Sequence, residues 1–122
     1  MSKLILIIDD EDEFCKIVKN NLELDKAFEV AIANNGKEGI KLAKKLKPDL
    51  VLLDIIMPEM NGFQVLETLK KDLQTITIPV VMLTAKGDDY SKIKAAGLYD
   101  DRYIVKPVEA AVLKNKIMEV LS

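Results

Sequence analysis

The chain has 122 residues, of which 49% are hydrophobic, so it is long enough to form one domain with a substantial core. Its 18 basic and 20 acidic residues give a net charge of −2, which argues against nucleic-acid binding, and no apolar stretch reaches the roughly 20 residues of a membrane span. Histidine is absent and Cys15 is the only cysteine, which excludes an internal disulfide, a cysteine-based zinc site and a phosphohistidine on this chain. These features predict a cytoplasmic protein that uses oxygen ligands for any metal ion.

The first expected element is a buried strand over residues 4–8, a continuous apolar run that ends in a series of acids. A helix over residues 12–25 follows, because apolar residues recur at helical spacing: Phe14, Ile17, Val18 and Leu22. Asp9 and Asp10 lie at the carboxyl end of the strand, where adjacent carboxylates repel each other unless a positive group is near. Plain helix capping is the alternative interpretation of this pair.

The next expected strand covers residues 28–33, which alternate loosely and fit the edge of a sheet. A helix follows the turn signal Asn34-Asn35-Gly36, with its inward face marked by Ile40, Ala43 and Leu46. We expect this helix to end before Lys47-Pro48, because a residue that precedes proline avoids helical geometry.

The central stretch of the chain is Val51-Leu52-Leu53-Asp54-Ile55-Ile56-Met57-Pro58. Its apolar run predicts a strand buried on both faces of a parallel sheet, with Asp54 at the carboxyl end. In open α/β sheets ligands bind outside that edge, so the carboxylate is placed for chemistry. The alternative is an aspartate that caps the following loop.

The second half of the chain repeats the alternation of helices and strands. A third helix is marked by Val65, Leu66, Leu69 and Leu73, and a strand over residues 79–83 ends in Thr84-Ala85. A fourth helix is expected over residues 88–96, and a fifth strand over residues 103–105. Lys106-Pro107 then leads into a last helix whose inward residues are Ala110, Leu113, Ile117 and Leu121.

This alternation predicts an α/β fold, a doubly wound five-stranded parallel sheet with helices on both faces. The carboxyl ends of parallel strands share one edge, and the polar residues that follow the strands collect there: Asp9, Asp10, Asp54, Thr84 and Lys106. Carboxylates suit Mg²⁺, a lysine offsets charge in phosphoryl transfer, and a threonine hydroxyl can donate to a phosphoryl oxygen. Asp54 can then act as a nucleophile that forms an acyl phosphate. No glycine-rich nucleotide-binding loop is present.

Over nearly its whole length the chain resembles the receiver domain of two-component response regulators, and in particular the single-domain chemotaxis receivers. The matching residues are Asp9-Asp10, Asp54 with the residues up to Pro58, Gly62, Thr84-Ala85, Tyr103 and Lys106-Pro107. The resemblance implies one receiver domain over residues 1–122, with the flavodoxin-like strand order 2-1-3-4-5.

The resemblance further implies that Asp54 accepts a phosphoryl group from a sensor histidine kinase or a histidine phosphotransfer protein. Mg²⁺ would be bound by Asp10, Asp54 and the carbonyl of Ile56, with Asp9 acting through water. Lys106 would pair with the phosphoryl group, and its peptide bond to Pro107 would be cis.

By the same resemblance, Thr84 would move to the phosphoryl oxygen and Tyr103 would swing inward. The switch would alter the face of helix 4, strand 5 and helix 5 that binds a downstream protein. Such a domain is no enzyme beyond its own phosphorylation and slow dephosphorylation.

Two stretches depart from the family pattern. Gly97 is followed by five residues before Tyr103, which predicts an altered surface between the fourth helix and the fifth strand. Ile56 stands where many receivers carry a polar side chain, and it predicts slow hydrolysis of the phosphoryl-aspartate. Two other functions stay open: a pseudo-receiver scaffold that is never phosphorylated, and a Mg²⁺-dependent aspartyl phosphohydrolase, for which the sequence supplies no capping element.

Overall fold

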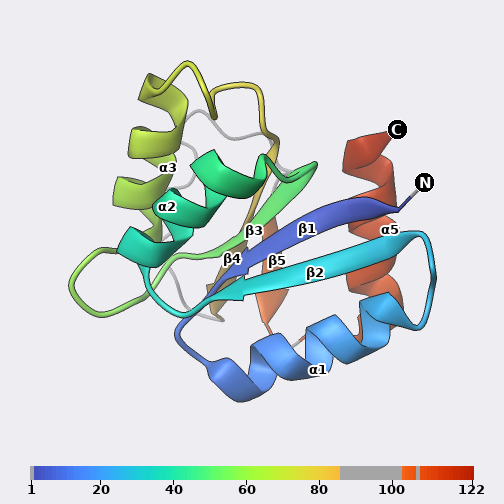
Figure 1. Cartoon of the computed structure of the whole chain (residues 1–122). Helices are drawn as coiled ribbons and strands as arrows, with labels where there is room; N and C mark the ends of the chain where they lie inside the picture. The colour runs from blue at the N-terminus through green and yellow to red at the C-terminus, as the bar shows by residue number, and fades with distance from the viewer. Residues whose placement is uncertain (1, 86–102, 107) are drawn as a thin grey trace.

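The computed structural model describes residues 2–85, 103–106 and 108–122 (Figure 1). Within these ranges five strands form one parallel sheet in the order β2-β1-β3-β4-β5. The strands are β1 (Lys3–Ile8), β2 (Phe28–Ala33), β3 (Leu50–Asp54), β4 (Val80–Ala85) and β5 (Tyr103–Lys106). The predicted fold class and strand order are therefore confirmed, and β2 lies at an edge as expected. The helix predicted over residues 88–96 and the segment from Gly97 to Arg102 lie outside the described residues.

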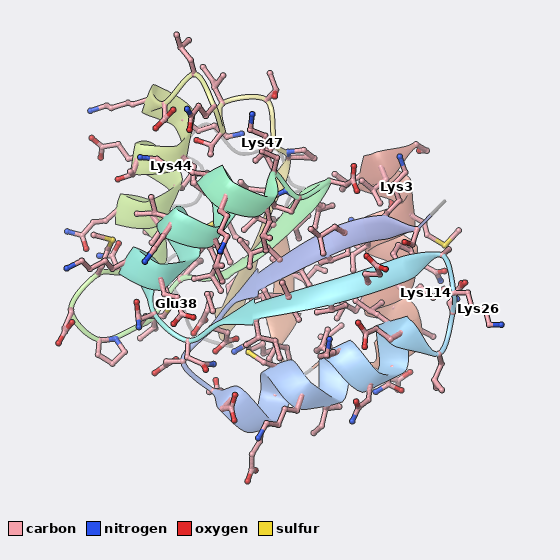
Figure 2. All side chains as sticks on the ribbon, in the orientation of Figure 1. Lys3, Lys26, Glu38, Lys44, Lys47 and Lys114 are labelled. Atoms are coloured by element: carbon pink, nitrogen blue, oxygen red, sulfur yellow. The ribbon has the colours of Figure 1, made fainter. Side chains whose placement is uncertain are left out.

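Helices cover both faces of the sheet. Figure 1 shows α1 and α5 on one face and α2 and α3 on the other; their bounds are α1 (Asp12–Glu23), α2 (Gly36–Leu46), α3 (Gly62–Lys71) and α5 (Ala110–Leu121). Charged side chains project outward, as Figure 2 shows for Lys26 and Lys47. No helix in the described ranges is both long and apolar enough to cross a membrane.

Each strand contributes alternate side chains to two separate cores. Ile5 and Ile7 of β1 pack toward α1 and α5, whereas Leu6 and Ile8 pack toward α2 and α3. All five residues of β3 are buried. This is the burial expected of a central parallel strand, which has a helix layer on each face and so reads as a continuous apolar run.

Helix ends follow local sequence signals. The Asn35 side chain accepts a hydrogen bond from the Glu38 N–H at the start of α2, and Lys47 ends that helix in a left-handed conformation with φ of 47°. The predicted end before Lys47-Pro48 is confirmed. At the start of α3, Asn61 and Gln64 form a reciprocal capping box.

Leu46 and Ala110 were predicted to face inward but are exposed, so these two predictions are wrong, and Ile17 and Leu73 of the apolar patterns are exposed as well. Ile17 is 60%, Leu46 38% and Leu73 90% exposed, and Ala110 is also exposed. Leu73 lies beyond the last residue of α3, while the other three lie at the margin of an apolar stripe or at a helix end. Helical spacing marks a stripe about 100° wide, but the flat sheet contacts only its centre.

Candidate functional site

Four of the predicted polar residues meet at the carboxyl edge of the sheet. Asp9 directly follows β1, Asp54 ends β3, Thr84 is the penultimate residue of β4 and Lys106 ends β5. Parallel pairing brings Asp54 opposite Leu83 and places Ala85 opposite Lys106. The strand topology alone therefore gathers residues that lie up to 97 positions apart in the sequence.

Asp9 is fully buried, and both its side chain and its backbone carbonyl accept hydrogen bonds. One of its carboxylate oxygens, Oδ1, accepts a hydrogen bond from the Glu11 N–H at 2.9 Å, and Oδ2 accepts one from Lys106 Nζ at 2.7 Å. Its backbone carbonyl accepts hydrogen bonds from the side chains of Asn34, at 3.0 Å, and Cys15, at 3.5 Å. Asp9 therefore both closes the turn before α1 and pairs with a cation, so the two interpretations of this residue are compatible.

Asp54 is only 6% exposed, and its Oδ1 lies 3.8 Å from Lys106 Nζ. Burial raises the pKa of the Asp54 carboxyl from 3.8 to about 7, helped by the negative charges of Asp9 and Asp10 and opposed by Lys106. Desolvation and like charges both disfavour the ionised form. A cation that bound beside Asp54 would relieve both effects.

Lys106 is the cation that already lies in this site, with a side chain only 12% exposed. Its Nζ donates to Asp9 and, at 3.0 Å, to Oε1 of Glu11, and it lies 4.4 Å from the centroid of the Phe14 ring. Burial acts to lower the pKa of Lys106, but the hydrogen bonds to the two carboxylates outweigh it and the pKa is raised. Lys106 is therefore a charged group with defined partners.

Glu11 and Phe14 were not recognised as site residues from the sequence. Glu11 is one of five consecutive acids, and nothing local distinguishes it from its neighbours. Phe14 fits the apolar stripe of α1, and it does pack partly buried against the core beneath that helix. The signal that could have found Glu11 was Lys106, because a lysine at the end of a buried strand needs carboxylate partners.

The donor set fits a hard metal ion such as Mg²⁺. Carboxylate oxygens of Asp9, Glu11 and Asp54 lie within 4.8 Å of one another, and oxygen donors are the ligands that Mg²⁺ prefers. Asp10 is exposed and is not part of this group, although its charge still acts on Asp54. The resemblance had favoured Asp10 over Asp9 as the direct ligand, and its carboxylate here is the outermost of the pair.

The loop that follows Asp54 is tightly fixed. A Cβ on Gly62 would overlap the carbonyl oxygen of Asp54, and the Gly62 N–H donates to the Ile55 carbonyl at 2.7 Å. Glu59 has a φ of 67°, and the N–H of Met60 donates to the carbonyl of Pro58 across it, a three-residue turn that is rare in proteins. The acceptor is thus attached to a rigid segment of backbone.

The remaining predicted residues that the structure describes belong to β4, β5 and the loop after β3. Thr84 is fully buried, Tyr103 is half-buried against the α2/α3 core, and the Ile56 side chain is 62% exposed. Pro107 and the predicted cis peptide bond lie outside the described residues.

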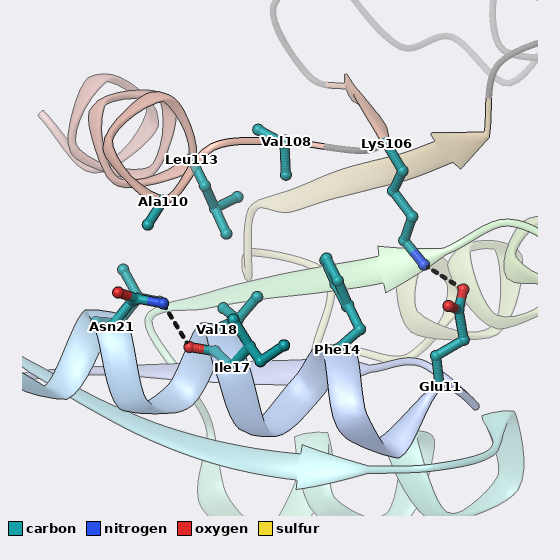
Figure 3. A pocket seen from close by; sticks show the side chains of 10 residues that line it. Glu11, Phe14, Ile17, Val18, Asn21, Lys106, Val108, Ala110 and Leu113 are labelled. Atoms are coloured by element: carbon teal, nitrogen blue, oxygen red, sulfur yellow. Dashed lines mark hydrogen bonds and ion pairs between the residues drawn. The ribbon is translucent and has the colours of Figure 1, made fainter.

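A groove of about 510 Å³ opens beside the site, between α1 and the start of α5. Its walls are mainly apolar and include Phe14, Ile17 and Leu113. Figure 3 shows Glu11 and Lys106 joined at one end of it.

Comparisons with known proteins agree with this geometry. Residues 5–118 match the model of the response regulator receiver domain family. The chain is 33% identical over 121 residues to the alkaline phosphatase synthesis transcriptional regulatory protein PhoP of Bacillus subtilis, covering 99% of this chain and 49% of that protein. It is 42% identical over 107 residues to the transcriptional regulatory protein SrrA of Staphylococcus aureus, covering 88% and 43%. The chain spans about half the length of these curated relatives.

Solved structures of similar proteins cover nearly the whole chain. The chemotaxis protein CheY4 of Vibrio cholerae is 28% identical with a TM-score of 0.86, covering 98% of this chain and 99% of that chain. A CheY-like response regulator receiver domain protein of Methanospirillum hungatei is 32% identical with a TM-score of 0.86, covering 99% and 94%. The fold and the sequence therefore point to the same group of proteins.

Proposed function

The chain belongs to the response regulator receiver domain family of two-component systems, and from this premise we propose that Asp54 accepts a phosphoryl group from a phosphohistidine. The donor is a sensor histidine kinase or a histidine phosphotransfer protein. One observation carries the proposal. The buried carboxylate of Asp54, at the end of β3, lies 3.8 Å from the ammonium group of Lys106, at the end of β5 on the same edge of the sheet.

The transfer requires Asp54 in its ionised form. A carboxylate oxygen of Asp54 attacks the phosphorus, a P–O bond forms, and the P–N bond to the donor histidine breaks. The imidazole leaves with the electron pair of that bond and takes up a proton. Because its surroundings raise the pKa of Asp54 to about 7, positive charge near the carboxyl favours the reactive form.

Mg²⁺ fits the oxygen donors of the site and, when bound, offsets the negative charge of the phosphoryl group. We propose that Asp54 and the Ile56 carbonyl hold the ion together with Asp10, whose exposed carboxylate lies outside the group of Asp9, Glu11 and Asp54, and that Asp9 acts through water. Lys106 pairs with the transferred group, and the hydroxyl of the buried Thr84 donates to a phosphoryl oxygen.

Phosphorylation adds a charge of about −1.5 to −2 at Asp54. We propose that Thr84, Tyr103 and the Lys106-Pro107 segment respond to it and alter a face for a downstream protein formed by residues 88–96, β5 and α5. That face, the single domain over residues 1–122 and the cytoplasmic location stay predictions.

The test is exposure of the parent, Asp54→Asn and a control, Asp12→Asn, to acetyl phosphate with Mg²⁺, followed by intact mass. Asp12 is an exposed acid of the first turn of α1. We expect one added phosphoryl group on the parent and on the control, and none on Asp54→Asn. Equal modification of Asp54→Asn would refute the proposal. Continuous phosphate release without an adduct would identify a phosphohydrolase, and neither adduct nor turnover would identify a scaffold.

A further inference from the structure

Lys106 has more partners than phosphoryl transfer requires. Its ammonium group lies 2.7 Å from Asp9, 3.0 Å from Glu11 and 3.8 Å from Asp54. The first two distances are hydrogen bonds, whereas the third is too long for one. In the state described here, Lys106 is therefore bonded to two carboxylates that are not the acceptor.

The two bonded carboxylates differ in how firmly they are held. Asp9 is fully buried, and its second oxygen is already bonded to the Glu11 N–H. The Glu11 side chain is 64% exposed, so water can replace Lys106 as its partner at small cost. If Lys106 gives up one carboxylate, it is that of Glu11.

Phe14 restricts the remaining freedom of the ammonium group. Its ring lies 4.4 Å from Lys106 Nζ, within the range of a cation–π contact, and it lies in the first turn of α1, three residues after the N-cap residue Glu11. An aromatic face attracts the ammonium without accepting a conventional hydrogen bond. Phe14 therefore keeps Lys106 at this edge whichever carboxylate it is bonded to.

We propose that Glu11 competes with the phosphoryl group on Asp54 for Lys106, and so acts as a positioning residue that favours the unphosphorylated state. Before transfer, Glu11 draws Lys106 toward α1. After transfer, the buried and more highly charged phosphoryl group takes Lys106, and the Glu11 carboxylate is released to water. This inference rests on the proposed function of Asp54.

The exchange also changes the groove between α1 and α5. Figure 3 shows the Glu11–Lys106 pair at one end of that groove, with Phe14 beside it. Release of Glu11 frees a carboxylate at this end. The contact between Lys106 and Glu11, the residue before α1, thereby depends on whether Asp54 is phosphorylated.

The test compares Glu11→Gln with Glu13→Gln. Both variants remove one exposed acid near the start of α1, but Lys106 is bonded to Glu11 and not to Glu13, whose charge acts on the exposed Lys16. With acetyl phosphate and Mg²⁺, we expect Glu11→Gln to be phosphorylated about two- to fivefold faster than the parent, the range that an exposed ion pair implies. Glu13→Gln should match the parent.

A second measurement separates this role from a structural one. In protein labelled with ¹⁵N-lysine, the Lys106 Nζ signal of unphosphorylated Glu11→Gln should shift toward its position in the phosphorylated parent. An unchanged signal, or equal rates in the two variants, would overturn the proposal. Weaker Mg²⁺ binding together with slower phosphorylation would also overturn it, because Glu11 would then be a metal ligand. A parent that is not phosphorylated would refute the function of Asp54 itself.

Discussion

On the α2/α3 face of the sheet, packing is so close that a Cβ would overlap side-chain atoms at Gly36 and Gly39 and backbone atoms at Gly62. On the α1/α5 face, a groove of about 510 Å³ stays open, and Ile17 at its side is 60% exposed. Both faces bury a core against the sheet, but the α1/α5 face also carries an open groove between its helices.

The difference matters because the two halves of the site depend on different faces. The backbone around Asp54 is fixed from the α2/α3 face, through contacts of Gly62 with Asp54 and Ile55. Two further partners of Lys106, Glu11 and Phe14, come from the α1/α5 face. The acceptor is therefore held still, while the cation has room to exchange partners.

The largest expected effect is at Gly62. Gly62→Ala should lower the free energy of unfolding by about 2 to 3 kcal/mol, because the added Cβ meets the backbone of Asp54, even though alanine favours a helix by about 1 kcal/mol. Urea unfolding measures the change. Ala110→Val, which adds bulk beside the open groove, is the control and should change stability by less than about 0.5 kcal/mol. Equal losses in both variants would remove the contrast between the faces.

The next effect is at Asp54, where the rigid backbone holds an unfavourable charge. Its pKa is 3.8 in its ordinary environment and about 7 in the folded chain, so the folded state retains a proton that the unfolded state loses. The stability of the parent should therefore fall as pH rises through this window. Without Mg²⁺ at pH above 7, Asp54→Asn should unfold with a free energy about 1 to 3 kcal/mol higher than the parent.

Urea unfolding at several pH values tests this prediction. Asp54→Asn should show a flatter dependence on pH, and the difference from the parent should shrink toward acid pH. Asp12→Asn, which removes an exposed ion pair with Lys16, should keep the pH dependence of the parent. If the difference in the free energy of unfolding between Asp54→Asn and the parent were the same at pH 8 as at pH 5, the negative charge of Asp54 would already be compensated in the folded protein.

A smaller effect is expected at Ile56, on the fixed loop beside the acceptor. Its side chain is 62% exposed, so an amide placed there can orient water near the phosphoryl group. Ile56→Asn should shorten the lifetime of the phosphorylated form, by less than the ~10²-fold of a well-placed general base because the exposed site leaves the amide mobile. Leu73→Asn makes the same kind of change at an exposed residue after the end of α3, and it should leave the lifetime unchanged. Equal decay in parent and Ile56→Asn, in one Mg²⁺ buffer, would leave this side chain without a role.

The smallest change in stability is expected beside the groove on the α1/α5 face. Ile17→Gln should change the free energy of unfolding by less than about 0.5 kcal/mol, because the side chain already contacts water. Val18→Ala on the same helix, at a residue only 5% exposed, should cost more. A loss above about 1 kcal/mol in Ile17→Gln would show that the groove is packed in solution.

The sequence by itself determined the strands, their parallel arrangement and the edge that carries the site. Continuous apolar runs, helical periodicity and proline or glycine signals are local, so they can be read from neighbouring residues. Once the strands were parallel, their carboxyl ends had to share one edge, which brought Asp9, Asp54, Thr84 and Lys106 together.

Only the tertiary structure decided which charges meet. It placed Glu11 against Lys106 across 95 positions of sequence, and it set the Phe14 ring beside the same ammonium group. It also showed that Gly62 is required by the Asp54 carbonyl, and that Ile17 and Leu73 face water. These facts depend on side-chain direction and on distances between separate elements, which local periodicity does not encode because it fixes the face of an element but not its neighbour.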